Sequence, residues 1–376
     1  MRKLNILILS WRGPTHPLAG GAEISTFEHA KGWLKAGSKV TLFTSYFNGA
    51  KKEETLEGVE IIRKGKDAFG VKFAALFWYL FENHTKFDLV VDEFHGIPFF
   101  TPLYVRAKKL AFIHEVAKEI WWLNTWQKPF NYIPGIIGTI FEPLIFKFIY
   151  KGTRFMTVSE STKSDLINWG ISAKRIKVIY NGVHTIPVKT KKEKKETAVF
   201  LGALAKDKGI EDAIKTFGLI NNQNSDWQFW VLGWGSQNYL FKLKKLSRNV
   251  GIENKIKFWG FVDNKKKFEL LSRAHVFINP SVREGWGLVN IEANSVGTPV
   301  VGYDVPGIRD SVVDGRTGIL SKLGDYKSLA QSAIKLCGDI SLYRKICNEA
   351  MSRSKDFSWA KSSSESLALI REITNS

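Results

Sequence analysis

The chain has 376 residues, of which 44% are hydrophobic and 24% charged, and its 55 Lys and Arg against 36 Asp and Glu give a net charge of +19. This length predicts two domains, and the composition excludes a disordered chain. Two cysteines, Cys337 and Cys347, exclude a disulfide framework and fit a reducing cytoplasm. The excess of basic residues predicts an acidic partner.

Segments typical of buried strands alternate with helical segments from the start, and the opening run MRKLNILILSWRG predicts a strand rather than a signal peptide. This alternation indicates an α/β fold with two Rossmann-like, doubly wound parallel-sheet domains facing across a cleft. In the first half we expect helices over 22–36 and from Ser159 or Ser161 to near Gly170. The expected strands are Leu4–Ser10, Lys39–Thr44, Val59–Arg63, Asp88–Asp92, Leu110–His114, Phe155–Val158 and Ile176–Ile179.

The second half begins after a lysine-rich stretch, Lys189–Glu196, which we interpret as a solvated linker. An amphipathic helix that opens at Phe357 and finishes near Ile373 closes the chain, and the sequence leaves open which half it packs on. The expected strands of this half, each followed by a helix, are Ala198–Leu201, Gln228–Leu232, Lys257–Trp259, Val276–Asn279 and Pro299–Gly302.

Aromatic residues crowd into the segment 119–150, where they alternate with isolated charges. They are Trp121, Trp122, Trp126, Phe130, Tyr132, Phe141, Phe146, Phe148 and Tyr150. Because Pro129, Pro134 and Pro143 fall within this segment, we expect it to be interrupted short of the ~20 residues that a membrane span needs. An interfacial segment on an anionic membrane is the favoured interpretation, and a core helix pair or an acceptor groove is the alternative. RNA binding is less favoured because no aromatic platform motif is found.

Two features of the first half lie where strands end. Gly20 and Gly21 precede the helix that contains Glu23, so that helix N-terminus could receive a phosphate or a sugar hydroxyl, or the pair could simply form a tight turn. The loop has neither the spaced dinucleotide fingerprint nor a Walker lysine, which disfavours nicotinamide and ATP. His114 ends a strand, where a ligand-facing or a structural imidazole is expected.

In the second half, the segment PSVREGWGLVNIE places Glu284 and Glu292 on either side of a glycine turn that leads into a helix from about Gly287. One carboxylate could hold hydroxyls and the other the reacting sugar, unless both are merely solvated acids. Lys206 and Lys208 lie between a strand end and a helix start and could neutralise a diphosphate, or be surface lysines. Gly233, in VLGWGSQ, could flank a base.

Taken in order, these segments resemble the retaining glycosyltransferases of family 4, which have the GT-B fold, over nearly the whole chain. The resemblance rests on GGAE at Gly20, VSESTKSDL at Val158, VIYNGV at Val178, the Lys208-Gly209 pair, PSVREGWGLVNIEA and VDGRTGIL. It implies an acceptor-binding domain over 1–182, completed by a crossing helix over 358–376, and a nucleotide-sugar-binding domain over 183–357.

The resemblance also implies a role for each site residue. Glu292 would hold the ribose, Glu284 the donor sugar, and Lys208 the leaving phosphate, while His114 would approach the donor sugar. The catalytic set would be Glu284, His114 and Lys208, and the donor-binding set Gly20, Gly21, Lys206, Gly233, Gly287, Leu288, Val289 and Glu292. The chain departs from the family's G-R-L-x-x-x-K-G run at Ala203, which replaces the usual arginine, so either Lys206 would supply its charge or the diphosphate would be held with less positive charge.

The expected activity is retaining hexosyl transfer from a nucleotide-diphosphate sugar to a hydroxyl of a saccharide or lipid-linked saccharide, in the cytoplasm or at the cytoplasmic face of a membrane. No D-x-D pair is present, so we expect neither metal nor other cofactor, and no nucleic-acid partner. A GT-B sugar-nucleotide epimerase and a basic membrane- or nucleic-acid-binding protein with a degenerate site are the alternatives.

Overall fold

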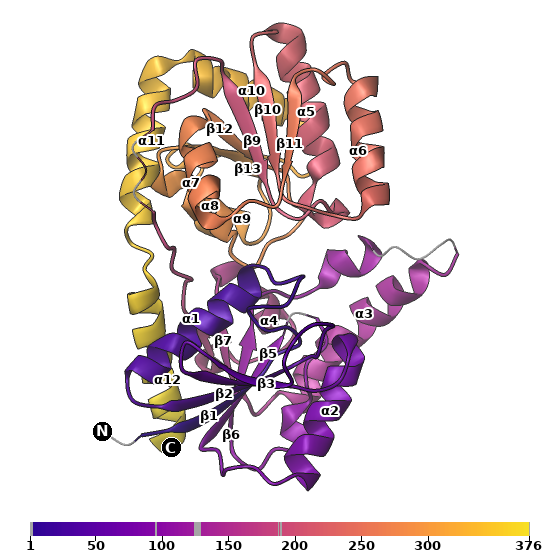
Figure 1. Ribbon diagram of the computed structural model, residues 1–376, viewed down its shortest axis with the longest axis vertical. Coiled ribbons are helices and arrows are strands. Elements are labelled where there is room, and N and C mark those ends of the chain that lie inside the picture. The colour runs from indigo at the N-terminus through magenta and orange to yellow at the C-terminus, as the bar shows by residue number, and fades with distance from the viewer. Residues whose placement is uncertain (1–2, 95, 124–128, 187, 189, 376) are drawn as a thin grey trace. The chain divides into compact units, whose positions relative to one another are not determined.

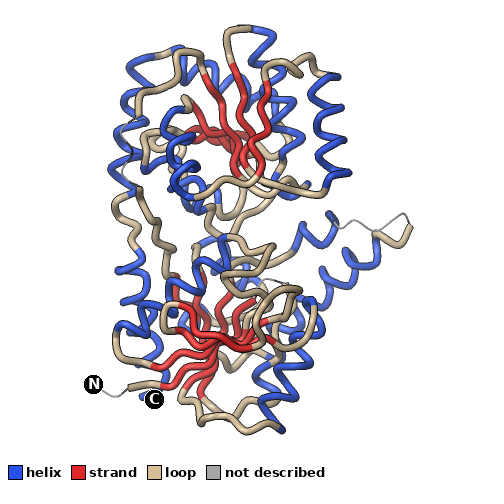
Figure 2. Tube along the Cα trace, viewed as in Figure 1, coloured by secondary structure: helices blue, strands red, loops and turns tan. Residues whose placement is uncertain are grey.

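The computed structural model describes residues 3–94, 96–123, 129–186, 188 and 190–375 (Figure 1). Residues 1–182 and 358–376 form one compact unit, and residues 183–357 form the other. In each unit helices flank a central sheet (Figure 2), which is the two-domain α/β architecture that the sequence predicts.

The first unit contains an eight-stranded sheet in the order β3-β4-β2-β1-β5-β6-β7-β8, parallel except for the antiparallel pair β3–β4. Its strands are β1 Asn5–Leu9, β2 Lys39–Thr44, β3 Glu53–Leu56, β4 Val59–Arg63, β5 Leu89–Phe94, β6 Lys108–Ile113, β7 Arg154–Thr157 and β8 Ile176–Val178. Its longer helices are α1 Gly21–Lys35, α2 Asp67–Phe81, α3 Tyr132–Leu144, α4 Glu160–Asn168 and α12 Trp359–Asn375. The short ones are η1 Thr101–Leu103, η2 Lys118–Leu123, the π-helix η3 Ile145–Ile149 and η4 Ala173–Arg175.

The pairing register assigns helices to the two faces of this sheet. Leu7 lies opposite Val90, and Asp92 opposite Ala111, so these four side chains share one face because side chains alternate along a strand. That face is covered by α2 and the η3 region, through Val71, Ala75, Trp78, Phe146 and Tyr150. The other face is covered by α1, whose His29 ring lies 5.5 Å from that of Phe112.

The C-terminal helix α12 packs on α1. The Ser366 hydroxyl accepts from Trp33 Nε1 at 2.8 Å and lies 2.9 Å from His29 Nδ1, with all three side chains buried. A Cβ on Gly32 would lie 2.2 Å from that of Ser363, so the two helices approach as closely as a glycine allows. The helix expected from Phe357 onward therefore belongs to the first unit.

The second unit contains a six-stranded parallel sheet in the order β11-β10-β9-β12-β13-β14. Its strands are β9 Thr197–Leu201, β10 Gln228–Leu232, β11 Ile256–Gly260, β12 Val276–Asn279, β13 Val300–Tyr303 and β14 Gly318–Ser321. Its helices are η5 Lys206–Lys208, α5 Ile210–Gln223, α6 Gln237–Asn249, α7 Asn264–Arg273, α8 Leu288–Ser295, α9 Ile308–Ser311, α10 Tyr326–Gly338 and α11 Ile340–Ser354.

Where the structure describes the expected linker 189–196, at residues 190–196, four residues are exposed, as a solvated linker requires: Thr190, Lys191, Lys194 and Lys195. Lys192 is the exception, because it is half-buried and its Nζ donates to the carbonyls of Ala274 at 2.5 Å and Gly297 at 3.2 Å and to Thr298 Oγ1 at 2.9 Å. Burial lowers the pKa of Lys192 to about 8. The interpretation as a solvated linker therefore holds for most of the described residues and fails at Lys192, because three acceptors of the second unit lie within reach of its ammonium.

The aromatic segment is also more continuous than its prolines indicate. From Tyr132 to Ile149 the chain is helical, first as α3 and then as η3, with Pro143 inside it. By length and composition alone these 18 residues could cross a membrane, with a mean hydropathy of 1.4 and 22% of the stretch buried. The prediction that the prolines interrupt the run was therefore wrong. Trp126 lies outside the described residues.

Candidate active site

Two loops at the carboxyl edge of the second unit's sheet bring Lys208 and Glu284 together. Lys208 ends η5, after β9, and Glu284 lies in the loop after β12. Lys208 Nζ lies 3.0 Å from Glu284 Oε1, which also accepts from Ser281 Oγ at 2.8 Å. Both charged side chains are partly exposed, at 26% and 16%. The pair therefore presents an ammonium and a carboxylate at the strand ends, where ligands of doubly wound sheets bind.

Close backbone approaches hold the loop after β12 in place. Gly209 has φ +68°, and a Cβ there would lie 1.9 Å from the Pro280 carbonyl oxygen. Gly307 has φ +81°, and its Cβ would lie 2.0 Å from the Glu284 carbonyl oxygen. Any larger residue at either position would displace the loop that carries Glu284.

The helix expected near Gly287 is α8, with Gly287 as its N-cap in the left-handed region. Asn290 fixes this end, because its amide accepts from Asn279 Nδ2 at 2.7 Å and donates to Ser311 Oγ at 2.9 Å. The N–H groups of the first turn, at Leu288 and Val289, have no helical acceptor, as at every helix start. This end is therefore a fixed donor site suited to an anion.

Glu292 lies in the middle of α8, half-buried, and its Oε1 is 2.5 Å from Lys267 Nζ on α7. The sequence gives no signal for Lys267, which lies 25 residues away from its partner. Both predicted carboxylates are therefore paired with lysines rather than merely solvated.

The remaining predicted donor residues of this unit lie at the same sheet edge. Lys206 is exposed at the start of η5, three residues after the exposed Ala203. Gly233 directly follows β10, and its N–H donates to the Gly260 carbonyl at 2.9 Å.

In the first unit, Gly20 is the N-cap of α1 and Gly21 its first residue. The Gly20 N–H donates to Glu23 Oε2 at 2.7 Å, while Arg12 Nε donates to Glu23 Oε1 at 2.7 Å and Arg12 NH1 to the Leu18 carbonyl at 2.9 Å. The buried Glu23 therefore fixes the glycine loop against the start of α1.

His114 directly follows β6 and is buried. Its Nε2 lies 3.1 Å from Glu93 Oε1 and 3.3 Å from Thr26 Oγ1. Glu93, on β5, was not singled out from the sequence, although an acid near a strand end was a usable signal. With Nε2 facing this carboxylate, Nδ1 is the ring nitrogen left to meet a ligand.

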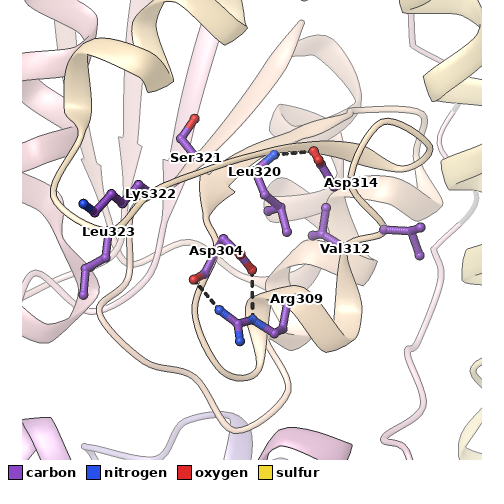
Figure 3. Close-up of a pocket in the computed structure, with 9 residues that line it drawn as sticks. Asp304, Arg309, Val312, Asp314, Leu320, Ser321, Lys322 and Leu323 are labelled. Atoms are coloured by element: carbon purple, nitrogen blue, oxygen red, sulfur yellow. Dashed lines mark hydrogen bonds and ion pairs between the residues drawn. The ribbon is translucent and has the colours of Figure 1, made fainter.

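A separate hollow of about 570 Å³ lies in the second unit (Figure 3). Some of its polar groups are already paired: Arg309 Nε donates to Asp304 Oδ1 at 2.8 Å, and the Leu320 N–H donates to Asp314 Oδ1 at 2.8 Å (Figure 3). None of the predicted site residues lines it, so we assign the site to the loops rather than to this hollow. Among the described residues, no group of three or more His, Cys, Asp or Glu could hold a metal ion.

Two family models match the chain and together cover most of it. Residues 19–186 match Glycosyltransferase Family 4, and residues 184–353 match Glycosyl transferases group 1. The chain is a family-4-like glycosyltransferase of the GT-B fold. The predictions of family and fold are confirmed.

Curated relatives of this glycosyltransferase match it over different lengths. It is 30% identical over 161 residues to the capsular polysaccharide biosynthesis glycosyltransferase CapM of Staphylococcus aureus, covering 41% of this chain and 40% of CapM. It is 26% identical over 328 residues to an uncharacterized glycosyltransferase of Methanocaldococcus jannaschii, covering 82% of this chain and 80% of that protein. The match to CapM therefore spans less than half of CapM.

Solved structures resemble the glycosyltransferase along its full length. Sucrose-phosphate synthase from Thermosynechococcus elongatus has a TM-score of 0.81 at 18% identity, with 99% of each chain covered. HepE of Anabaena, solved in complex with UDP and glucose, has a TM-score of 0.71 at 18% identity, covering 98% of this chain and all of HepE. At this identity the likeness establishes the fold.

Proposed function

We propose that this glycosyltransferase moves a hexosyl group from a nucleotide-diphosphate sugar to a hydroxyl of a saccharide or lipid-linked saccharide, with retention of anomeric configuration and without a metal. The observation that carries the proposal is the pairing of Lys208 with Glu284 in the second unit, beside the fixed start of α8. An ammonium, a carboxylate and free helical N–H groups are what a sugar diphosphate requires.

In this proposal the diphosphate binds at the N-terminus of α8, against the N–H groups of Leu288 and Val289. Glu292 accepts from the ribose hydroxyls and Glu284 from hydroxyls of the donor sugar. Lys208 stabilises the charge that develops on the leaving phosphate, which is preorganised electrostatic catalysis. Ala203 stands where the family has an arginine, and Lys206 supplies positive charge in its place. Gly233 flanks the base of the nucleotide.

The acceptor is proposed to bind on the first unit. The acceptor hydroxyl attacks the anomeric carbon from the face that the phosphate leaves, the bond from that carbon to the phosphate oxygen breaks, and the hydroxyl proton passes to a phosphate oxygen. No enzyme carboxylate forms a bond to the sugar in this scheme. His114 contacts the donor sugar, and Gly20 and Gly21 face the diphosphate.

A thermal-shift screen across UDP-, GDP-, ADP- and dTDP-sugars tests the donor, since a ligand that binds only the folded state raises its stability. A Glu292→Gln variant should show a smaller thermal shift with the donor that binds. When the reaction with the selected donor is run in the presence of EDTA, the products should be free nucleoside diphosphate and a glycoside. NMR should show that the glycoside has retained its anomeric configuration. An isomerised sugar nucleotide would favour the epimerase, and no shift with any donor would overturn the proposal.

We place the reaction in the cytoplasm, at the face of a membrane that carries a lipid-linked acceptor. The aromatic segment 119–150 and the net charge of +19 support this location. The two cysteines, Cys337 and Cys347, are free thiols, as a reducing compartment would keep them.

A further inference from the structure

The π-extended helix formed by α3 and η3 has one buried side and one exposed apolar side. On the buried side, Cβ atoms on Gly135 and Gly138 would lie within 2.5 Å of the Trp122 and Trp121 rings, so these indoles pack directly on the helix backbone. The opposite side is exposed and carries Ile136, Ile137, Ile140, Phe141, Leu144 and Phe148. In Figure 1, α3 extends outward from the sheet of its unit.

Helix α2 has a second apolar stripe, which the sequence interpretation did not single out. Its buried side, Val71, Ala75 and Trp78, packs on the sheet. Its exposed side carries Phe69, Phe73, Phe77, Leu80 and Phe81. A helical spacing of three and four residues places these side chains on one side of the helix. Exposed aromatic residues in such number are unusual on a helix that faces water.

Both stripes belong to the same side of the first unit. The sheet face that contains Leu7, Val90 and Ala111 is covered by α2 and by η3, while α1 and α12 cover the other face. The two exposed apolar surfaces therefore lie on the outer side of the one layer of helices that covers this sheet face.

The charge beside the exposed stripe of α3 and η3 is basic. Residues 129–151 contain only three charged residues, of which Glu142 is buried and accepts from the Ala117 N–H at 2.7 Å and Trp121 Nε1 at 2.9 Å. The other two are the exposed Lys147 and Lys151, so the charge that this segment presents to water is entirely positive. Lys147 Nζ lies 5.6 Å from the centre of the Phe148 ring, which places an ammonium beside an exposed aromatic.

We propose that α2 together with α3 and η3 forms a docking surface for an anionic lipid bilayer, with the exposed Phe and Ile side chains at the depth of the headgroups. Lysines at the margin of an apolar stripe are the arrangement that binds anionic interfaces. The proposal deepens the membrane location proposed above, and it is independent of the transfer chemistry, because none of its residues belongs to the transfer site.

Docking on the surface fits the helix better than crossing the bilayer. Glu142 ties the C-terminal end of α3 to the start of η2, and the Tyr150 hydroxyl, directly after η3, donates to the buried Asp92 Oδ2 at 2.5 Å. A helix held to its sheet at these points presents one side, rather than its whole circumference, to lipid.

The test is flotation of the full chain with vesicles of phosphatidylcholine alone and with 30% phosphatidylglycerol. We expect the protein to float with the anionic vesicles at low salt and to dissociate as salt rises. The double variants Phe73→Ser/Phe77→Ser and Ile136→Ser/Ile140→Ser should each lower the vesicle partition coefficient at least about tenfold. Phe241→Ser/Ile340→Ser is the matched control, because these residues of the second unit are 63% and 67% exposed and should leave partitioning unchanged.

The role of charge is tested by the double variant Lys147→Glu/Lys151→Glu. The control is Lys244→Glu/Lys245→Glu on α6, and only the first double variant should weaken flotation. Unchanged thermal unfolding and unchanged donor-induced thermal shifts would establish that each variant is folded. Failure of the native protein to float, or equal losses in the test and control pairs, would overturn the proposal. A dimer seen by light scattering would also overturn the proposal if the Phe and Ile variants dissociated that dimer and still bound the vesicles.

Discussion

Lys208 Nζ and Glu284 Oε1 lie 3.0 Å apart, and this pair joins the loop after β9 to the loop after β12. The contact brings together two residues that are 76 positions apart in the chain. Each side chain retains some exposure, so a bound donor can meet both without unfolding either loop.

We predict that Lys208→Ala and Glu284→Ala each reduce kcat by at least about a hundredfold, the usual effect of removing one electrostatic stabiliser of a transition state. Lys215→Ala is a matched control, because Lys215 pairs with Asp212 on α5 in the same unit. Steady-state kinetics with the identified donor provide the measurement. Near-normal turnover in both variants would remove this pair from the mechanism.

Glu292→Gln should weaken donor binding by about ten- to a hundredfold, because a hydrogen bond to a charged group contributes about 1.5–3 kcal/mol. The effect should appear in KM and in the dissociation constant from calorimetry, with kcat nearly unchanged. Glu269→Gln serves for comparison, since Glu269 pairs with Lys266 and Arg273 on α7. Equal affinities in the two variants would contradict the role of Glu292.

Gly209→Ala should destabilise the second unit more than Gly251→Ala. Both glycines have positive φ, at +68° and +73°, so an alanine costs about 1–2 kcal/mol at either position. Only Gly209 adds a clash, because its Cβ would lie 1.9 Å from the Pro280 carbonyl, whereas Gly251 faces open space. Urea unfolding measures the free energy of unfolding of the two variants. Identical losses of stability would mean that the loop after β12 moves away from the new Cβ at no cost.

Glu93→Gln should lower kcat, because the Glu93 carboxylate lies beside His114 Nε2 and orients the ring. A loss of about tenfold is expected from removing one orienting partner. Glu82→Gln, which alters an exposed pair with Lys64, should leave kcat unchanged. If Glu93 were only structural, the Gln variant would lose stability without any loss of kcat.

Stability should depend on pH through His29, whose pKa is lowered to about 3 by burial and by the nearby His114. The unfolded chain binds a proton with the ordinary histidine pKa of 6.5, whereas the folded chain does not, so this stability is present above about pH 6.5 and is lost as the pH falls toward 3. A His29→Gln variant should therefore lose less stability over that range, by up to several kcal/mol at roughly 1.4 kcal/mol per pKa unit. Parallel pH curves from urea unfolding would contradict this.

The sequence was most informative where local pattern and local structure coincide. Lys39–Thr44, Val59–Arg63, Gln228–Leu232 and Val276–Asn279 are strands with the bounds that were expected. The strands β3 and β14 were missed: each lies at an edge of its sheet, and β3 begins with two glutamates. Short or charged edge strands depend on their neighbours for hydrogen bonds, so their own sequence carries little signal.

By itself the sequence determined the α/β class, the family and the segments that carry the candidate site, because turns, caps and buried strands are encoded in neighbouring residues. Only the tertiary structure decided that Lys208 meets Glu284, that Lys267 meets Glu292 and that Glu93 meets His114. It likewise decided that Lys192 meets three acceptors and that α2 leaves a row of phenylalanines exposed. Charge pairing and burial depend on residues far apart in the chain, and these come together only when the sheet forms.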